Sequence, residues 1–428
     1  MNRKSSRARL PLLAFLGPGL MLAATGVGAG DLAGGAFAGM NLGVAVLWAV
    51  VLGALFKYVI TEGLARWQLA TETTLLEGAV LRLGPVIRWG FLVYLLLWSF
   101  GVGTSLIGAC GVATHALFPV FEQASTAKIV FGILHSLLGL ALVWIGSFRF
   151  LERTMAVLVS VMIIVVLATG VFVGSDWGAV FRGLTVPKVP DHPEGVAWTL
   201  ALMGGVGGTL TVLCYGYWIR EKHRTGPEDL RICRWDIGVS YFLMALFGIA
   251  MVILSDGLQL SGKGATLVVD LANRVGEKTH ASVEILFLAG AWAAVFSSLL
   301  GVWQAVPYLF ADFWHLQSQK NSLSPDHFKP YRVDTRGKAY RGYLIALALV
   351  PLLGLGYDFQ IVQKANSVFG ALVMPMVALT LLLLNGRAAW VGQSLRNRWW
   401  TSLTLIVIIG FFAWVGLPKL LATLGLGV

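Results

Sequence analysis

The segment Gly26-Val27-Gly28-Ala29-Gly30-Asp31 interrupts the first long apolar stretch of this chain. A second glycine-rich segment, Gly204-Gly205-Val206-Gly207-Gly208, interrupts another apolar stretch in the second half. A helix broken inside hydrocarbon exposes backbone amides and carbonyls, which are costly unless they line a cavity or bind a ligand. Breaks at matching positions of two halves are typical of the binding site of a membrane transporter. The sequence therefore predicts a substrate-binding site between the two breaks. Its predicted residues at the breaks are Gly28, Ala29, Gly30, Gly207 and Gly208.

The composition supports a polytopic membrane protein. Of 428 residues, 57% are hydrophobic and 12% are charged, whereas soluble proteins carry about 25% charged residues. Stretches of roughly 20 apolar residues predict eleven spans, at 11–40, 44–65, 87–118, 127–147, 154–174, 196–219, 235–256, 281–313, 340–356, 359–384 and 400–424. The loops between them are too short for a soluble catalytic domain, and no nucleotide-binding loop or nucleophile motif is present. We therefore expect neither an enzyme nor a bound cofactor.

The net charge of +11 does not indicate nucleic-acid binding, because its distribution follows the membrane. If the N-terminus is cytoplasmic, the cytoplasmic segments carry 23 of the 32 Lys and Arg residues and the outer segments carry seven. This is the positive-inside bias, and with eleven spans it places the C-terminus outside. The basic start is followed by an apolar run too long for a signal peptide, so we expect an uncleaved first helix. The compact loops favour a prokaryotic inner membrane.

The two breaks divide the chain into halves of five helices each. We expect a cytoplasmic tail at 1–10, a first repeat at 11–175, an extracytoplasmic linker at 176–195 and a second repeat at 196–384. The remaining residues, 385–428, contain a loop and an eleventh helix. Because five is odd, the two repeats would have inverted topology.

Several motifs resemble the Nramp (natural-resistance-associated macrophage protein) family of proton-coupled divalent metal transporters. Gly17-Pro18-Gly19 opens the first helix as in that family, and Leu47-Trp48 begins the second. The segment Ala65-Arg66-Trp67-Gln68-Leu69-Ala70-Thr71, with Leu75 and Glu77, is similar to a signature after helix 2. Further matches are Leu151-Glu152-Arg153 and Arg182-Gly183-Leu184-Thr185-Val186-Pro187. The resemblance implies the all-α LeuT-type fold, a 5+5 inverted repeat with an eleventh helix, in which helices 1 and 6 are unwound at mid-membrane.

The chain departs from that family at the metal site. The family's D-P-G-N falls on Gly28-Ala29-Gly30-Asp31, so a glycine replaces the metal-binding Asp. Its M-P-H falls near Gly207-Gly208-Thr209, so the thioether and the imidazole are missing. In helix 3 the family carries an Asp and a Glu for proton movement. Those positions fall near Val102 and Ser105 of this chain, whose side chains cannot titrate. A divalent ion needs several ligands with compensating negative charge, so this site is poor for manganese or iron.

The remaining polar residues near the breaks are the other candidates for the site. Asp31 is a candidate substrate or metal ligand, because a carboxylate at this depth is costly; the alternative is a cap on the resumed helix. The other predicted substrate-binding residues are Thr209, Thr211, Asn366 and Ser367. Predicted coupling or gating residues are Lys57, Glu62, Ser105 and His115. The alternatives are that Lys57 snorkels or pairs with Glu62 and that His115 is a surface or interface residue.

Three functions stay open at this point. The first is an Nramp-related secondary-active transporter of an altered ion substrate, such as a hydrated divalent cation like magnesium. The second is a carrier of a small anion or organic solute held by the half-helix N-termini of helices 1 and 6. The third is a membrane sensor that no longer transports. The expected partners are a small ion or small molecule and the lipid bilayer.

Overall fold

The computed structural model describes residues 17–172, 176–261, 264–319, 328 and 330–423, and these residues form helices and no strands. The first half contains α2 (Gly17–Gly26), η1 (Gly30–Gly34), α3 (Gly35–Leu42), η2 (Gly43–Val46), α4 (Leu47–Thr71), α5 (Leu75–Leu83), α6 (Pro85–Leu117), α7 (Ala124–Ile145) and α8 (Phe148–Phe172). The connection to the second half contains α9 (Trp177–Thr185).

The second half begins at α10 (Gly195–Gly205). It continues through η3 (Leu210–Leu213), α11 (Cys214–Glu221), η4 (Pro227–Asp229), α12 (Leu230–Ser255), η5 (Gly264–Thr266), α13 (Leu267–Lys278), α14 (Ala281–Ser318), α15 (Lys338–Leu349), η6 (Val350–Gly356), α16 (Phe359–Ala371) and α17 (Val373–Asn385). A short α18 (Ala388–Val391) and the long α19 (Trp399–Thr423) complete the described chain.

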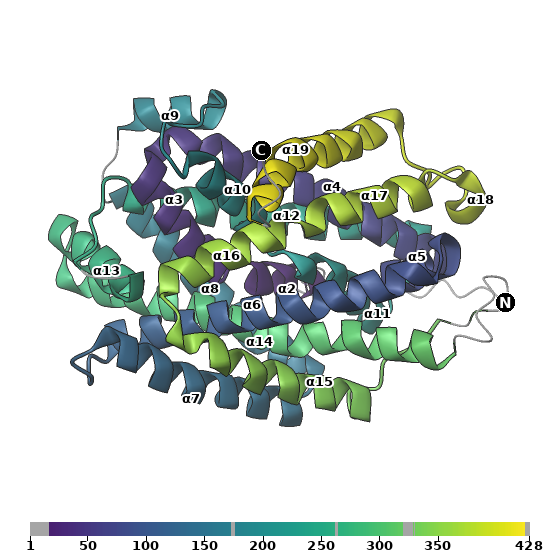
Figure 1. Cartoon of the computed structure of the whole chain (residues 1–428), viewed down its shortest axis with the longest axis horizontal. Coiled ribbons are helices and arrows are strands. Elements are labelled where there is room, and N and C mark those ends of the chain that lie inside the picture. The colour runs from purple at the N-terminus through teal and green to yellow at the C-terminus, as the bar shows by residue number, and fades with distance from the viewer. Residues whose placement is uncertain (1–16, 173–175, 262–263, 320–327, 329, 424–428) are drawn as a thin grey trace, which may run out of the picture.

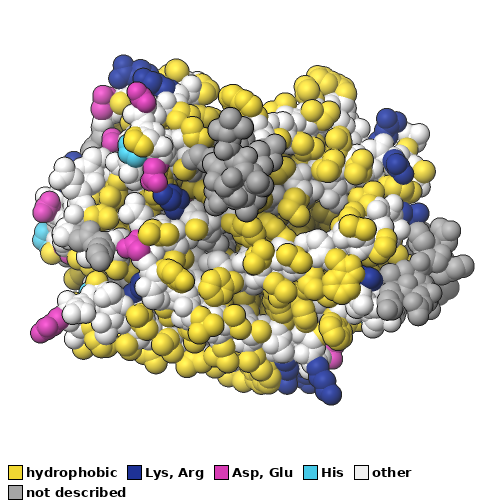
Figure 2. Space-filling view, in the orientation of Figure 1, with side chains coloured by type: hydrophobic (Ala, Val, Ile, Leu, Met, Phe, Trp, Pro, Cys, Tyr) yellow, Lys and Arg dark blue, Asp and Glu magenta, His cyan; other side chains and the backbone are white. Residues whose placement is uncertain are grey.

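The helices match the predicted membrane architecture. Among the described residues, nine helical runs are long and apolar enough to cross a membrane, and Trp399–Trp414 is a shorter apolar helix. One of the nine, Gly30–Thr71, joins the second part of predicted span 1 to span 2, and α2 supplies the first part of span 1. Within the described residues, all eleven predicted spans fall on helices; the predicted tail 1–10 and residues 11–16 of span 1 lie outside the described residues. Figure 2 shows hydrophobic side chains across the middle of the molecule and charged ones toward its two ends.

The connecting segments lie at two opposite ends. Figure 1 shows α9 and α13 at one end, here called the α9 end, and α5 and α18 at the other, the α5 end. The predicted linker 176–195 contains α9, which the Asp176 side chain caps by accepting from the amides of Gly178 and Ala179. The α5 helix begins with a capping box between Thr74 and Glu77. By the charge distribution, the α5 end is the predicted cytoplasmic side.

Both predicted helix breaks are present. The α2 helix ends at Gly26, and the chain resumes at Gly30 as a π-helix. The α10 helix ends at Gly205, after which Gly207 and Gly208 both have φ of +79°. Glycine adopts this left-handed conformation without the steric cost that a Cβ atom brings. The glycines of the second break therefore allow a sharp turn in the middle of the protein.

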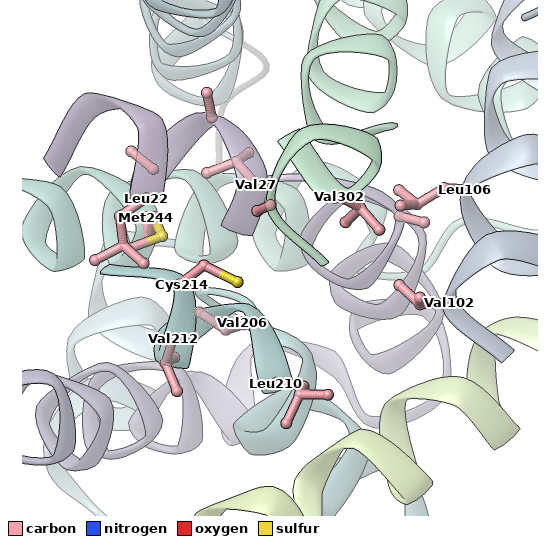
Figure 3. Close-up of a cluster of buried hydrophobic side chains, with 14 of the residues drawn as sticks. Leu22, Val27, Val102, Leu106, Val206, Leu210, Val212, Cys214, Met244 and Val302 are labelled. Atoms are coloured by element: carbon pink, nitrogen blue, oxygen red, sulfur yellow. The ribbon is translucent and has the colours of Figure 1, made fainter. Parts of the chain in front are cut away.

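The two breaks touch each other through their backbones. A Cβ atom on Gly26 would lie 2.9 Å from the carbonyl carbon of Gly207, and one on Gly30 would lie 3.1 Å from the Gly205 oxygen. Figure 3 shows apolar side chains around this contact, among them Val102 and Leu106 of α6 and Val302 of α14. The broken helices are thus enclosed by continuous ones.

Close backbone packing also joins α4 to α10, and a substitution at the contact tests how much this packing stabilises the protein. A Cβ atom on Gly53 would lie 2.8 Å from the Met203 oxygen and 3.0 Å from its Cα atom, both of them backbone atoms. We expect Gly53→Ala to destabilise the protein by about 1–3 kcal/mol, because overpacking forces α4 and α10 apart. The matched control is Gly90→Ala on α6, where a Cβ atom meets nothing within 4 Å. Thermal unfolding in detergent measures both variants, and equal midpoints would contradict the packing argument.

Candidate functional site

A small cavity lies between the two helix breaks. Its volume is about 30 Å³, while one buried water needs roughly 10–15 Å³. None of the side chains that line it is ionisable. The lining residues are Thr25, Gly26, Gly28, Ala29, Gly30, Trp98, Val102, Ser105, Leu106, Gly205, Gly208, Thr209, Thr211, Ser298, Val302, Asn366 and Ser367.

Among the residues that line this cavity, three polar side-chain atoms have no hydrogen-bond partner within the described part of the chain. They are Thr25 Oγ1, Asn366 Oδ1 and Ser367 Oγ, and each of these atoms is buried. A buried polar group without a partner costs about 1–3 kcal/mol, so such groups call for a ligand or a water. Because they come from α2 and α16, a bound molecule would connect the first broken helix to the second half of the chain.

The other polar groups of the cavity are held in place by neighbours. Trp98 Nε1 donates to Thr209 Oγ1 at 2.7 Å, and the Ser298 hydroxyl donates to the Thr25 carbonyl at 2.7 Å. Ser105 donates to Gln363 Oε1 at 2.6 Å. These bonds fix α6, α14 and α16 around the breaks, so the wall of the cavity is rigid.

Asp31 lies beside the cavity but does not line it. Its two carboxylate oxygens accept from the Gly207 amide, each at 3.2 Å, and its side chain is fully buried. The carboxylate therefore binds the amide that the second break exposes, and it joins the first broken helix to the second. Its predicted role as a direct substrate or metal ligand stays a prediction.

Lys57 reaches the same break from α4. Its ammonium donates to the Gly204 carbonyl at 2.8 Å and to the Val206 carbonyl, and the side chain is 1% exposed. Lys57 and Asp31 are close enough to interact electrostatically. At the second break, the exposed amide therefore donates to the Asp31 carboxylate, and the exposed carbonyls accept from the Lys57 ammonium.

The α11 helix, which follows the second break, is tied down toward the α5 end. Tyr217 donates to Asp312 Oδ2 of α14 at 2.5 Å, and Trp218 donates to Gln304 at 3.0 Å. Arg220 pairs with Glu77 at 3.2 Å. We call these contacts the inner latch, because they hold α11 against α14 and α5.

The predicted gating residues Glu62 and His115 lie away from the cavity. Glu62 of α4 pairs with Arg66 and with Arg234 of α12, each at 2.8 Å. His115 is buried at the end of α6 toward the α9 end, and its Nδ1 atom has no partner. Glu62 thus ties α4 to α12, and neither residue lines the cavity.

An ion pair joins the start of α10 to α16 toward the α9 end, and we call it the outer latch. Lys364 donates to Glu194, the residue that precedes α10, and its ammonium also lies 5.7 Å from the Trp198 ring centroid. The hydrogen bond from Lys364 lowers the pKa of Glu194 below its ordinary value. Lys364 therefore does not supply charge to the cavity.

The structure brings most of the predicted substrate-binding residues together. Gly28, Ala29, Gly30 and Gly208 line the cavity, as do Thr209, Thr211, Asn366 and Ser367, and the predicted coupling residue Ser105 lines it too. Gly207 binds Asp31 instead. Sequence reasoning missed Trp98, Ser298 and Gln363; of these, only Gln363 had a visible signal, as a polar residue three positions before Asn366 in a membrane span.

The outer latch generates a pH prediction. A depressed pKa means that the ion pair is present above the ordinary pKa of glutamate, about 4.3, and is lost as the pH falls through the depressed value. We expect Glu194→Gln at neutral pH, and acidification below about pH 4, to expose the cavity at the α9 end. A thiol reagent on Ser367→Cys, with the three native cysteines replaced, would then label several-fold faster.

The control for this measurement is Glu277→Gln, which removes an exposed carboxylate on α13 at the same end. It should leave the labelling rate unchanged. If Glu194→Gln and Glu277→Gln label equally fast, the ion pair does not restrict access to the cavity.

A family model and similar proteins of known description identify the family of this chain. The family model described as "Natural resistance-associated macrophage protein-like" matches residues 19–421. The chain is 24% identical over 403 residues to a "Divalent metal cation transporter MntH" of Mycobacterium tuberculosis, covering 92% of this chain and 88% of the relative. A protein of the same description from Klebsiella pneumoniae is 24% identical over 379 residues, covering 82% and 87% of the two chains.

Solved structures show the same fold. A manganese transporter of Eremococcus coleocola superposes with a TM-score of 0.74 at 18% identity, covering 96% of this chain and 87% of that chain. MhsT, solved in complex with L-phenylalanine, superposes with a TM-score of 0.60 at 14% identity, covering 94% and 96%. The predicted LeuT-type fold is therefore confirmed, and the match over nearly the whole chain shows that this protein is an integral membrane transporter of the Nramp family.

Proposed function

We propose that this chain is a secondary-active transporter that works by alternating access and carries a small polar solute rather than a transition-metal ion. The observation that carries the proposal is the cavity between the breaks, which has three unpartnered oxygens and no ionisable lining side chain. Hydroxyl and amide groups in a small apolar cavity select a ligand by hydrogen bonding. They provide no negative charge for a bare metal ion.

The names of the relatives point to divalent metals, and the site residues argue against that substrate here. Manganese and iron favour nitrogen, sulfur or carboxylate ligands. Gly28 and Gly207 stand where the family's metal-binding Asp and Met fall, and within the described residues no three His, Cys, Asp or Glu side chains group as metal ligands. The nearest carboxylate, Asp31, already accepts the Gly207 amide beside the Lys57 ammonium.

A hard divalent cation such as magnesium is the second candidate. Magnesium prefers oxygen ligands and keeps several of its waters, and the unpartnered groups Thr25, Asn366 and Ser367 all present oxygen. The volume of about 30 Å³ has no room for such a hydrated ion or for an amino acid, so the cavity would have to widen to hold either candidate. An anion is less well supported as the substrate, because the Gly207 amide that would bind it already donates a hydrogen bond to Asp31.

The two latches give alternating access a physical form. Opening toward the α5 end would break the inner latch at Tyr217 and Arg220, and opening toward the α9 end would break the outer latch at Glu194. In this conformation both latches are formed, which corresponds to an occluded state. Movement of α2 and α11 against α6, α12 and α14 would then carry the cavity from one side to the other.

The test is binding followed by flux. The purified protein is screened by thermal shift against small amides, alcohols and amino acids and against manganese and magnesium, and each hit is assayed in proteoliposomes. Thr25→Val and Ser367→Ala should each weaken binding of the true substrate by roughly 2–10-fold, the value of one neutral hydrogen bond. Ser160→Ala on the exposed face of α8 is the control.

Each outcome separates the candidates. Saturable flux of a neutral or zwitterionic solute that both cavity variants weaken supports the proposal. Magnesium flux with the same sensitivity supports the second candidate. Manganese flux at low concentration that neither Thr25→Val nor Ser367→Ala changes contradicts both candidates. Binding without flux would indicate a sensor.

A further inference from the structure

We infer that the second helix break contains a binding site for a monovalent cation, and that the protein fills this site with its own Lys57 ammonium. The site lies behind the cavity, on the α4 side of the break. Its ligands are the Gly204 and Val206 carbonyls, and its counter-charge is the Asp31 carboxylate. The inference concerns this pair of charges and holds whichever solute the cavity carries.

The carbonyls come from the unwinding of the helix. In a continuous helix the Gly204 and Val206 oxygens would accept amides four residues later, but α10 ends at Gly205. Gly207 and Gly208, with φ of +79°, turn the chain away. Two backbone oxygens are thereby left without helical partners in a buried place, where each needs a donor or a cation.

Lys57 meets that need with its ammonium group. Its ammonium donates to both oxygens, at 2.8 Å to Gly204 and at a shorter separation to Val206. An ammonium has three donors and no acceptor, so it interacts with these oxygens as a bound alkali ion would. Unwound backbone carbonyls of broken helices are known cation ligands, and here the occupant is covalently attached.

Asp31 completes the site electrostatically. It is fully buried and interacts with Lys57, and both of its oxygens accept the Gly207 amide. A buried carboxylate without a positive partner is strongly unfavourable. Lys57 and Asp31 therefore compensate each other, and a free cation is not needed to hold the two broken helices together.

The geometry of α4 directs Lys57 to this place. Gly53 lies one helical turn before Lys57 on the same face, and it packs against the Met203 backbone. This close approach brings α4 near enough for the lysine to reach the carbonyls of the break. The side chain is enclosed, since a Cβ atom on Gly207 would lie 3.6 Å from Lys57 Cδ and 3.1 Å from the Tyr241 ring.

The experiment vacates the site by Lys57→Met, which keeps an unbranched side chain and removes the ammonium. Full-length protein is purified in choline chloride, and its thermal midpoint is measured as NaCl or KCl is added at constant ionic strength. We expect the midpoint of Lys57→Met to be lowered in choline and to rise saturably with Na⁺ or K⁺, recovering at least half of the loss. The unsubstituted protein should show no such response.

Two controls make the result specific. Lys128→Met removes another buried lysine that donates to a carbonyl, that of Tyr357, and should lose stability without gaining a cation response. The double variant Lys57→Met/Asp31→Asn removes both charges and should be more stable in choline than Lys57→Met, again with no cation response. This non-additivity measures the coupling of the pair.

The inference is overturned if folded Lys57→Met shows no response to either cation, or if the unsubstituted protein responds equally. If Lys57→Met yields no folded protein in choline, folded yield that depends on Na⁺ or K⁺ supports the inference. If it folds in none of these salts, the double variant decides: recovery of folded protein supports charge compensation at this site, and failure to recover it overturns the inference.

Discussion

The structure depends on one constraint, which is that a helix opened in the middle of a membrane must find partners for the backbone groups it exposes. The second break meets this constraint from two directions, because Asp31 accepts its Gly207 amide and Lys57 donates to its Gly204 and Val206 carbonyls. The glycines allow the two breaks to approach each other through bare backbone. These contacts keep the two segments unwound, and the cavity lies between them.

The fold could be predicted well from sequence, because membranes leave few choices. Twenty-residue apolar stretches, the distribution of Lys and Arg, and two clusters of glycine give the spans and the breaks without further knowledge. The short helices at the ends were harder, since α9 depends on the Asp176 cap and α5 on the Thr74–Glu77 capping box. Such local hydrogen bonds leave only a weak signal in an otherwise polar loop.

The site was predictable only where backbone chemistry defines it. Gly28, Gly208 and Thr209 follow directly from the breaks, while Trp98 and Ser298 reach the cavity from helices far away in sequence. Asp31 was correctly placed beside the break, but sequence alone did not reveal that its oxygens accept the Gly207 amide. The environment of Lys57 was also invisible, because α4 contains Glu62 at a nearby position and only the packing of Gly53 directs the lysine toward α10.

The opposite charges of Lys57 and Asp31 have a consequence for energetics across the bilayer. Moving one elementary charge through the membrane potential changes the free energy by about 2.3 kcal/mol per 100 mV. A centre with one positive and one negative charge carries no net charge, so its reorientation is indifferent to voltage when both charges move together. In a secondary-active carrier of a neutral solute, the membrane potential would then act on the coupling ion and not on this centre.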